Sequence, residues 1–437
     1  MVALGCPKNQ VDAELMLARI AQAGMVIVGD HLMADVVVVN TCGFIRPAIQ
    51  ESINQIRSIL KLKRQGLVKK VIVCGCLAQR LADRLARDLR SVDAIVGLAY
   101  NNRLPEIIQR TLAGTRRRVY VEQIHDDIWS WEDTTRLLIG PGHTAYLRIS
   151  DGCSHKCSFC TIPAIRGPYR SRPMDQVLQE ARQLVESAKE LVIIGQDITA
   201  YLKDRGIRYG LVRLIEALEG LEGLQWIRLL YLYPSGISKQ LIGAIASSKK
   251  VVHYIDLPIQ HSDDQILEAM RRPYTNAGLR RLIDDLRQRI PDVVLRTTVI
   301  VGFPGETDQQ FESLLDFVQW AQFDALGCFP YYQEDGTPAA SLPNQVPGPE
   351  KARRYRKVMA RQQSISLAKN RARIGSVLTC LVDKVGPRQR CIGRFYGQAP
   401  EVDGTCIIHN CRCQPGASTK AVVTDARSYD LICDARR

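Results

Sequence analysis

Residues 151–160 read DGCSHKCSFC, which places three cysteines, Cys153, Cys157 and Cys160, in one short run. A structural zinc ion closes with four protein ligands, and His155, flanked by two of the cysteines, is poorly placed to share their metal. A 4Fe–4S cluster held by three cysteines leaves one iron without a protein ligand. The run therefore predicts an iron–sulfur cluster whose open iron can chelate a small molecule. A zinc site or a chance spacing is the alternative.

Length and composition set the broad class. The chain has 437 residues, too many for one hydrophobic core, so roughly two to four domains are expected. Its hydrophobic content of 46% and charged content of 24% are those of a globular protein. The sequence contains neither a membrane-span pattern nor a signal-peptide pattern, which predicts a cytoplasmic protein without a membrane partner. In that compartment, we expect the 14 cysteines to be metal ligands, reactive thiols or small core residues rather than members of disulfides.

The chain is strongly basic, with a formal net charge of +14. This charge favours a polyanionic partner such as RNA, although an ordinary solvated surface also explains it. A solvated helix face is expected for one basic group: Arg353, Arg354, Arg356 and Lys357. Contacts with anions are expected for the group that follows the cysteine run: Arg166, Arg170 and Arg172.

Residues 1–125 alternate short apolar strands with amphipathic helices, which is a doubly wound α/β pattern. The stretch NQVDAELMLARIAQAG predicts a helix that Gly24 closes, with Val11, Leu15 and Ala18 on one face. The first strand is very short, so a start upstream of Met1 stays open. The predicted strands are Val2–Leu4, Val36–Asn40, Val71–Cys74 and Ala94–Val96.

The alternation restarts over residues 143–371. Each of six strand candidates is followed by a helical stretch, the last of them the basic run from about Pro349 to Arg373. Six such units predict an open, partial barrel with its active site at the carboxyl ends of the strands, which is where the run 151–160 falls. The candidates are Ala145–Ser150, Leu191–Gly195, Trp226–Leu232, His253–Leu257, Val294–Gly302 and Asp324–Tyr331.

Two further segments complete the predicted organisation. Residues 126–142, within the stretches HDDIWSWEDTTR and IGPGH, are predicted to be a linker. Residues 372–437 carry short β runs such as VLTCLV and AVVTD separated by turns, which predicts a small β-barrel.

The cysteine run and its position after the first barrel strand resemble the radical S-adenosylmethionine (SAM) superfamily. The resemblance implies that the open iron binds SAM and that an electron from the cluster cleaves it to a 5′-deoxyadenosyl radical. Later strands end in IIGQDITAY and VIVGFPGE. We expect Gly302, Gly305 and Glu306 to let the backbone approach the nucleoside closely and to offer it an acceptor. We expect Gln196 and Asp197 to be polar groups at the rim. Ordinary turn chemistry after each strand is the alternative.

A second set of cysteines follows three predicted strands of the first domain. Cys6, Cys42 and Cys76 stand at the carboxyl ends of presumed parallel strands, which converge in an α/β crevice. Three thiolates there can hold another cluster. Cys74 competes with Cys76 for the third place, because residues two apart on a strand face the same side.

The whole chain is similar to the methylthiotransferase family of radical SAM enzymes. That family joins a flavodoxin-like N-terminal domain, a radical SAM barrel and a C-terminal TRAM β-barrel. Its motifs GC-P-K-N, N-T-C and G-C-L assign Cys6, Cys42 and Cys76 as cluster ligands and leave Cys74 as an extra. The strings GCPKNQVDAE, LRISDGCSHKCSFCTIPAIRGPYRSRP, YLYPSGI and GQAPEVDG resemble its RimO branch.

The resemblance implies an enzyme that adds a methylthio group to the β-carbon of an aspartate in ribosomal protein twelve of the small subunit, free or in the assembling subunit. It implies two 4Fe–4S clusters, two SAM molecules per turnover and an electron donor. One SAM methylates sulfur held at the N-terminal cluster, and the other supplies the radical. Contact with ribosomal RNA is a further expectation. The alternatives are a MiaB-like enzyme acting on adenosine in tRNA and a non-catalytic iron–sulfur RNA-binding protein.

The other cysteines carry weaker signals. Small core residues or inert thiols are expected at Cys328, Cys380, Cys391, Cys406 and Cys433. The tail string HNCRC raises the question of another metal, but no fourth ligand stands at a familiar zinc spacing from His409, Cys411 and Cys413.

Overall fold

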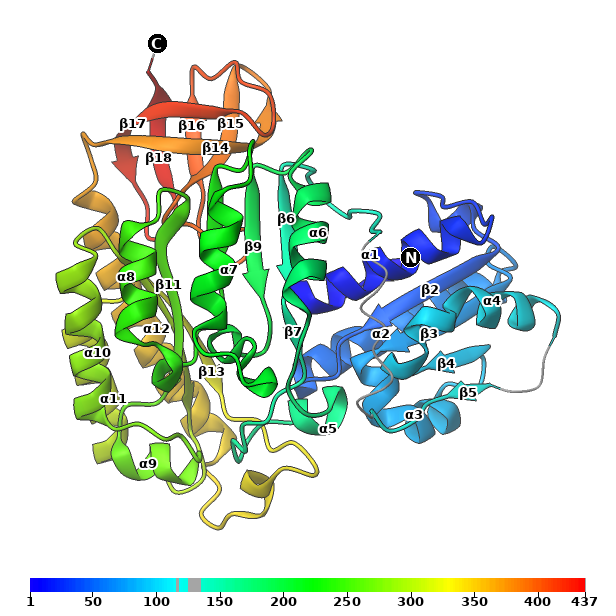
Figure 1. Ribbon diagram of the computed structural model, residues 1–437. Coiled ribbons are helices and arrows are strands. Elements are labelled where there is room, and N and C mark those ends of the chain that lie inside the picture. The colour runs from blue at the N-terminus through cyan, green and yellow to red at the C-terminus, as the bar shows by residue number, and fades with distance from the viewer. Residues whose placement is uncertain (115–117, 125–134, 437) are drawn as a thin grey trace. The chain divides into compact units, whose positions relative to one another are not determined.

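The computed structural model describes residues 1–114, 118–124 and 135–436 (Figure 1). The chain divides into two compact units. The first comprises residues 1–140, 146–156 and 160–180, and the second comprises residues 141–145, 157–159 and 181 onward. The predicted domain limits at 125, 142 and 371 stay predictions, and most of the predicted linker lies outside the described residues. None of the helices in the described ranges combines the length and apolar character that a bilayer span requires.

The N-terminal part of the first unit is a five-stranded parallel sheet with helices on both faces. Its strand order is β1-β2-β3-β4-β5, without the reversal that the flavodoxin order 2-1-3-4-5 contains. The four predicted strands are confirmed, whereas β5 has only two residues and therefore leaves no alternating pattern in the sequence. The strands are β1 (Val2–Ala3), β2 (Val36–Thr41), β3 (Lys70–Gly75), β4 (Ala94–Val96) and β5 (Val119–Tyr120). The helices are α1 (Pro7–Gln22), α2 (Arg46–Arg64), α3 (Cys76–Asp88) and α4 (Leu104–Leu112).

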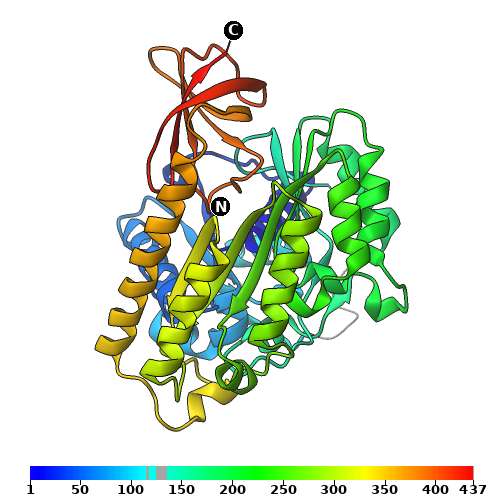
Figure 2. The same ribbon diagram turned by 90° about the vertical axis from the view of Figure 1, so that its left-hand side faces the viewer.

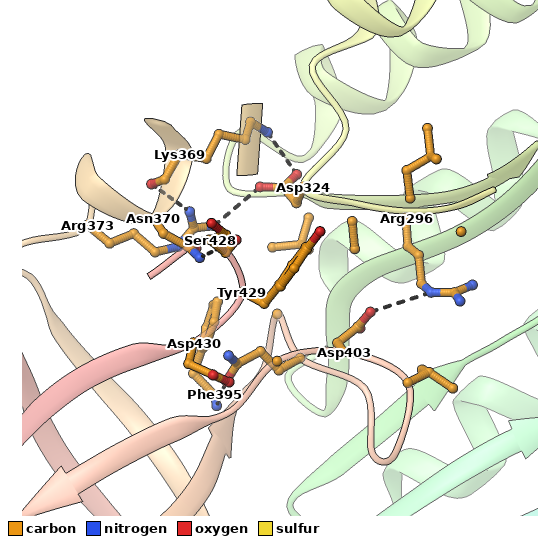
Figure 3. A pocket seen from close by; sticks show the side chains of 18 of the residues that line it. Arg296, Asp324, Lys369, Asn370, Arg373, Phe395, Asp403, Ser428, Tyr429 and Asp430 are labelled. Carbon is orange, nitrogen blue, oxygen red and sulfur yellow. Dashed lines mark hydrogen bonds and ion pairs between the residues drawn. The ribbon is translucent and has the colours of Figure 1, made fainter. Parts of the chain in front are cut away.

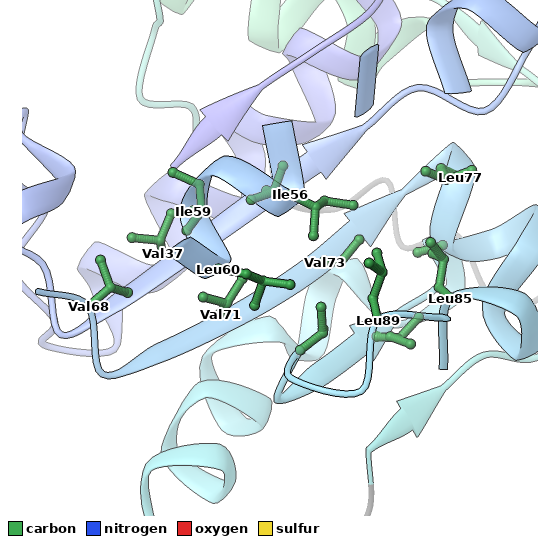
Figure 4. Close-up of a cluster of buried hydrophobic side chains, with 14 residues drawn as sticks. Val37, Ile56, Ile59, Leu60, Val68, Val71, Val73, Leu77, Leu85 and Leu89 are labelled. Carbon is green, nitrogen blue, oxygen red and sulfur yellow. The ribbon is translucent and has the colours of Figure 1, made fainter. Parts of the chain in front are cut away.

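Alternating side chains of β2 and β3 build two separate apolar layers. Val37 and Val71 face one layer, which α2 and α3 cover with side chains such as Ile56 and Leu85 (Figure 4). The intervening residues, among them Cys74, face the layer under α1 and α4. Because a strand has a period of two, each face of the sheet is sealed by its own pair of helices. The chemistry is left to the ends of the strands.

The six predicted barrel strands are all present. They form one sheet in the order β13-β12-β11-β10-β9-β6, an open partial barrel (Figure 1). These strands are β6 (Thr144–Arg148), β9 (Glu190–Ile194), β10 (Trp226–Leu229), β11 (Val251–Gln260), β12 (Val294–Val301) and β13 (Ala325–Pro330). The helices are α5 (Ile162–Arg166), α6 (Met174–Leu184), α7 (Gly210–Glu219), α8 (Lys239–Ser247), α9 (Asp264–Ala269), α10 (Asn276–Arg289), α11 (Asp308–Ala321) and α12 (Gly348–Arg371). A short pair, β7 (Ser150–Asp151) and β8 (Arg170–Ser171), flanks the cysteine run.

The C-terminal segment is a closed five-stranded barrel, as predicted. Helix α12 runs directly into it, as the orange ribbon of Figure 2 shows. The strand order is β14-β15-β16-β18-β17. The strands are β14 (Val377–Gly386), β15 (Arg390–Phe395), β16 (Cys406–His409), β17 (Ser418–Ala426) and β18 (Leu431–Ala435).

Two predictions about single residues are wrong. Cys391 and Cys411 are joined by a disulfide, because the backbone N–H of Cys411 bonds to the Gln389 carbonyl and brings their Cα atoms to 5.8 Å. The other predicted core thiols, such as Cys380 and Cys433, are buried as expected. Arg354 is not on a solvated face: it is 4% exposed, because it forms ion pairs with acidic residues of its own unit.

Candidate functional site

Each predicted N-terminal cysteine lies where a strand passes into a helix or loop. Cys6 is the N-cap of α1, Cys42 follows β2, and Cys76 is the first residue of α3. Helix N-termini carry a partial positive charge that favours a thiolate. Gly75 is required before Cys76, because its φ is +92° and an added Cβ would lie 2.3 Å from Asn40 Oδ1. The tight turn from β3 therefore presents Cys76 at the strand end.

The structure brings these three segments together. A Cβ added at Gly5, the neighbour of Cys6, would lie 2.8 Å from Cys42 Cβ. Cys76 Sγ lies 4.0 Å from Oδ1 of Asn9, in the first turn of α1. Cys74 lies elsewhere, with its thiol in the apolar layer under α1 and α4. The strand ends between Cys74 and Cys76, so the period-two argument that allowed both to face one side does not extend to Cys76.

Burial governs the electrostatics of these thiols. Burial raises the pKa of Cys76 to about 12, and the Arg166 guanidinium opposes that shift. Burial likewise raises the pKa of Cys42, again opposed by Arg166. Because the thiolate is the form that binds metal, metal binding at these cysteines is coupled to proton release.

Two of the three arginines after the cysteine run contact anions, but these are carboxylates of the same chain, whereas Arg170 donates to the Arg166 carbonyl at 3.3 Å. Arg172 forms an ion pair with Glu180, and Arg166 forms ion pairs with Asp12 and Asp151. Because these groups are buried together, they are part of the interior of the first unit. Sequence reasoning missed Asp12 as a partner of Arg166, because the two residues lie 154 positions apart.

The turn before Cys153 also requires glycine. Gly152 has a φ of +72°, and an added Cβ would lie 2.0 Å from the Pro168 carbonyl oxygen. The backbone N–H of Cys153 donates to the Gly167 carbonyl at 3.1 Å. Cys160 Sγ accepts a hydrogen bond from the Ile162 N–H at 3.5 Å, at the start of α5. Backbone contacts thus hold the first and last cysteines of the run in the first unit.

Residues 157–159 are anchored within the second unit. Ser158 donates its N–H to the Met270 carbonyl at 3.2 Å and its Oγ–H to the Ala269 carbonyl at 2.7 Å. The Arg272 guanidinium lies 5.6 Å from the Phe159 ring centroid and 4.8 Å from that of Tyr233. The segment that carries Cys157 is therefore fixed by a turn of the barrel that sequence reasoning did not single out.

The residues predicted to contact SAM lie in loops after β9 and β12. Asp197 Oδ1 accepts hydrogen bonds from the N–H and hydroxyl of Thr199 at 2.9 and 2.6 Å, which closes the turn after β9 and leaves Gln196 beside it. Glu306 accepts a hydrogen bond from the Phe303 N–H at 3.0 Å and one from the Gly302 N–H. These contacts shape the loops, and the role toward SAM stays a prediction.

The two loop glycines differ in their surroundings. An added Cβ at Gly302 would lie 2.3 Å from Lys351 Cγ, whereas one at Gly305 would meet open space. Of the two, only Gly305 leaves its Cα side open. Among the residues that the structure describes, no three His, Cys, Asp or Glu side chains are grouped as a single metal ion requires.

The described part of the second unit has cavities at both ends of its sheet. One of about 460 Å³ lies near the amino ends of β12 and β13, opposite the strand ends that carry the predicted site. Figure 3 shows its ion pairs Lys369–Asp324 and Arg296–Asp403. The tail strings APEVDG and SYDL meet there, since Val402 and Tyr429 both line it. A second cavity, of about 480 Å³, is lined by residues of the turns after β9 and β10, among them Thr199 and Ser235.

Comparisons with known proteins cover all three parts of the chain. Residues 147–318 match the radical SAM superfamily, residues 1–97 match the uncharacterized protein family UPF0004, and residues 374–435 match the TRAM domain. Among solved structures, the radical SAM methyltransferase TsrM from Kitasatospora setae aligns with a TM-score of 0.56 at 16% identity, over 78% of this chain and 74% of that one. That likeness concerns the fold.

The fold and the cysteine run thus define a radical SAM protein with a C-terminal TRAM domain. Two curated relatives are named ribosomal protein uS12 methylthiotransferase RimO. The protein from Desulforamulus reducens is 42% identical over 99% of this chain and 98% of its own length. The protein from Geobacter sulfurreducens is 45% identical over 99% and 97%. The chain belongs to the RimO family of radical SAM methylthiotransferases.

Proposed function

We propose that this enzyme adds a methylthio group to the β-carbon of an aspartate in ribosomal protein uS12. The observation that carries the proposal is the full-length identity of 42–45% with proteins named for that reaction. The tail strings APEVDG and SYDL support the same branch. The TRAM domain and the charge of +14 are consistent with contact with ribosomal RNA while uS12 is modified.

Two 4Fe–4S clusters are proposed, one on Cys153, Cys157 and Cys160 and the other on the N-terminal cysteines. The chemistry of the donors fits, because each set offers three thiols, and Gly75 and Gly152 shape the turns that carry Cys76 and Cys153. When bound, cluster and SAM supply the radical that takes hydrogen from an unactivated carbon. The protein's own contribution is to hold the thiolates at strand and helix ends.

The loop residues Gln196, Asp197, Gly302, Gly305 and Glu306 are proposed to line the SAM site. Gly305 supports this most directly, because its Cα side faces open space. Two SAM molecules per turnover and an external electron donor belong to the same proposal, and so does activity in the cytoplasm.

The test is mass spectrometry of a strain that lacks this gene. Ribosomal protein uS12 should lose its methylthio group, and tandem fragmentation should place the lost group on an aspartate. Methylthioadenosine in tRNA should be unchanged, and the plasmid-borne gene should restore the modification. Loss of methylthioadenosine from tRNA with uS12 still modified would contradict the proposal and favour the MiaB-like function.

A further inference from the structure

A buried cation lies against the N-terminal cysteines. The Arg166 side chain is 1% exposed, and its Nη2 atom lies 3.4 Å from Cys76 Sγ, so the guanidinium donates a hydrogen bond to this sulfur. The helix that ends at Arg166, α5, also packs Ile165 against Cys76. Arg166 is thus in direct contact with one of the three proposed ligands.

Two buried carboxylates fix the guanidinium in this position. Arg166 Nη2 donates to Asp12 at 2.7 Å, and Nη1 donates to Asp151 at 2.9 Å. The planar fork of an arginine is pre-organised for two such acceptors. Asp12 belongs to α1, the helix that Cys6 caps, and Asp151 immediately precedes the cysteine run. The orientation of Arg166 toward Cys76 is therefore set from two sides.

The same short segment contacts the cysteine run. The carbonyl of Gly167 accepts the backbone N–H of Cys153 at 3.1 Å. One dipeptide, Arg166–Gly167, therefore bonds to a cysteine of each set, through a side chain on one side and a peptide group on the other. All of these residues lie in the first unit.

We propose that Arg166 is a positioning residue that holds Cys76 and tunes the reduction potential of the N-terminal iron–sulfur cluster. This inference rests on the proposed function, because it takes that cluster as given. Hydrogen bonds to cluster sulfurs and nearby positive charge stabilise the reduced, more negative state. Removing the guanidinium should therefore make the N-terminal cluster harder to reduce.

The experiment uses the full chain with Cys153→Ala, Cys157→Ala and Cys160→Ala, so that any cluster signal comes from the N-terminal set. After anaerobic reconstitution, the midpoint potential is measured by redox titration followed by electron paramagnetic resonance. Arg166→Gln should lower the equilibrium constant for reduction of the cluster by about tenfold, which corresponds to a midpoint potential lower by about 59 mV for one electron. Arg166→Lys keeps the positive charge, so its midpoint potential should lie between those of the parent protein and of Arg166→Gln.

Arg148→Gln is the matched control. Arg148 is also buried and pairs with the same two aspartates, but it comes from β6. If Arg148→Gln shifts the potential as much as Arg166→Gln, or if Arg166→Gln leaves it unchanged in a cluster-loaded protein, the inference is overturned. A parent protein that binds no iron would instead contradict the proposed N-terminal cluster, and the inference with it. Circular dichroism of each variant identifies those that fail to fold.

Discussion

At the scale of single residues, buried side chains from other segments of the chain lie against the candidate cluster cysteines, as Arg166 does against Cys76. The run from Cys153 to Cys160 is local, so its spacing alone indicates a shared ligand. Arg166 and Arg272 become informative only once the fold places them against Cys76 and Phe159. These contacts join residues distant in sequence, and no periodicity encodes such pairs.

The choice between Cys74 and Cys76 is tested by two single substitutions. Wild-type protein should hold about eight irons if both clusters form. Cys76→Ala should reduce this to about four and abolish methylthio transfer. Cys74→Ala should keep all the iron, because Cys74 lies in the apolar layer under α1 and α4. Iron analysis after anaerobic reconstitution measures the difference between the two variants. Loss of iron in Cys74→Ala, with full iron in Cys76→Ala, would show that Cys74 is the ligand.

At the scale of elements, the strands and helices could be predicted because their apolar periods are long enough to read. The turns that carry function could not, because they depend on backbone contacts across the fold. Gly152 shows this: its sequence neighbours suggest only a loop, whereas the structure places it against Pro168. The long α12 was predicted in extent, but the burial of Arg354 depends on its partner Glu306 from the loop after β12.

Gly152→Ala should therefore disrupt the cysteine loop. The added Cβ meets the Pro168 carbonyl oxygen, so the strain of a positive φ combines with a backbone clash. Gly206→Ala is a close control, since Gly206 has the same φ of +72° with open space around it. Gly206→Ala should cost about 1–2 kcal/mol of stability, and Gly152→Ala should cost more and lose about half the iron. Equal melting temperatures and equal iron contents in the two variants would contradict this explanation.

At the scale of the whole molecule, the sequence indicated its separate parts but not what joins barrel and tail within the second unit. The joint is a buried charge network. Glu190, the first residue of β9, accepts hydrogen bonds from Arg228 and from Arg394 of β15, each at 2.7 Å. Asp383 of β14 pairs with Arg394 and with His143. A net charge of +14 cannot reveal such internal pairing.

Because of this network, the free energy of unfolding should fall at acid pH. Burial alone would raise the pKa of Glu190, but pairing with Arg228 and Arg394 lowers it below its usual value. The stabilisation is therefore complete above the unfolded-state pKa of about 4.3 and is lost as pH falls through the lower folded-state pKa. Glu190→Gln should lower the free energy of unfolding by about 3–5 kcal/mol at pH 7 and flatten its decline below pH 4.

Urea titrations at pH 7 and at lower pH measure this effect. Glu312→Gln is the control, because the Glu312 side chain is 55% exposed and forms its ion pair with the exposed Lys357. It should unfold like the wild type at every pH. An equal loss of stability in the two variants would show that the Glu190 network contributes nothing specific.

The cavity lined by Val402 and Tyr429 bears on how this family diverged. The two residues lie about 27 positions apart in the sequence, with strand β16 between them. They nevertheless line the same cavity. A substitution in one of the tail strings that carry these residues therefore changes the space available to the side chains of the other string. Among descendants of a common ancestor, substitutions in APEVDG should therefore be accompanied by substitutions in SYDL, and lineages that exchange one string while retaining the other should be rare.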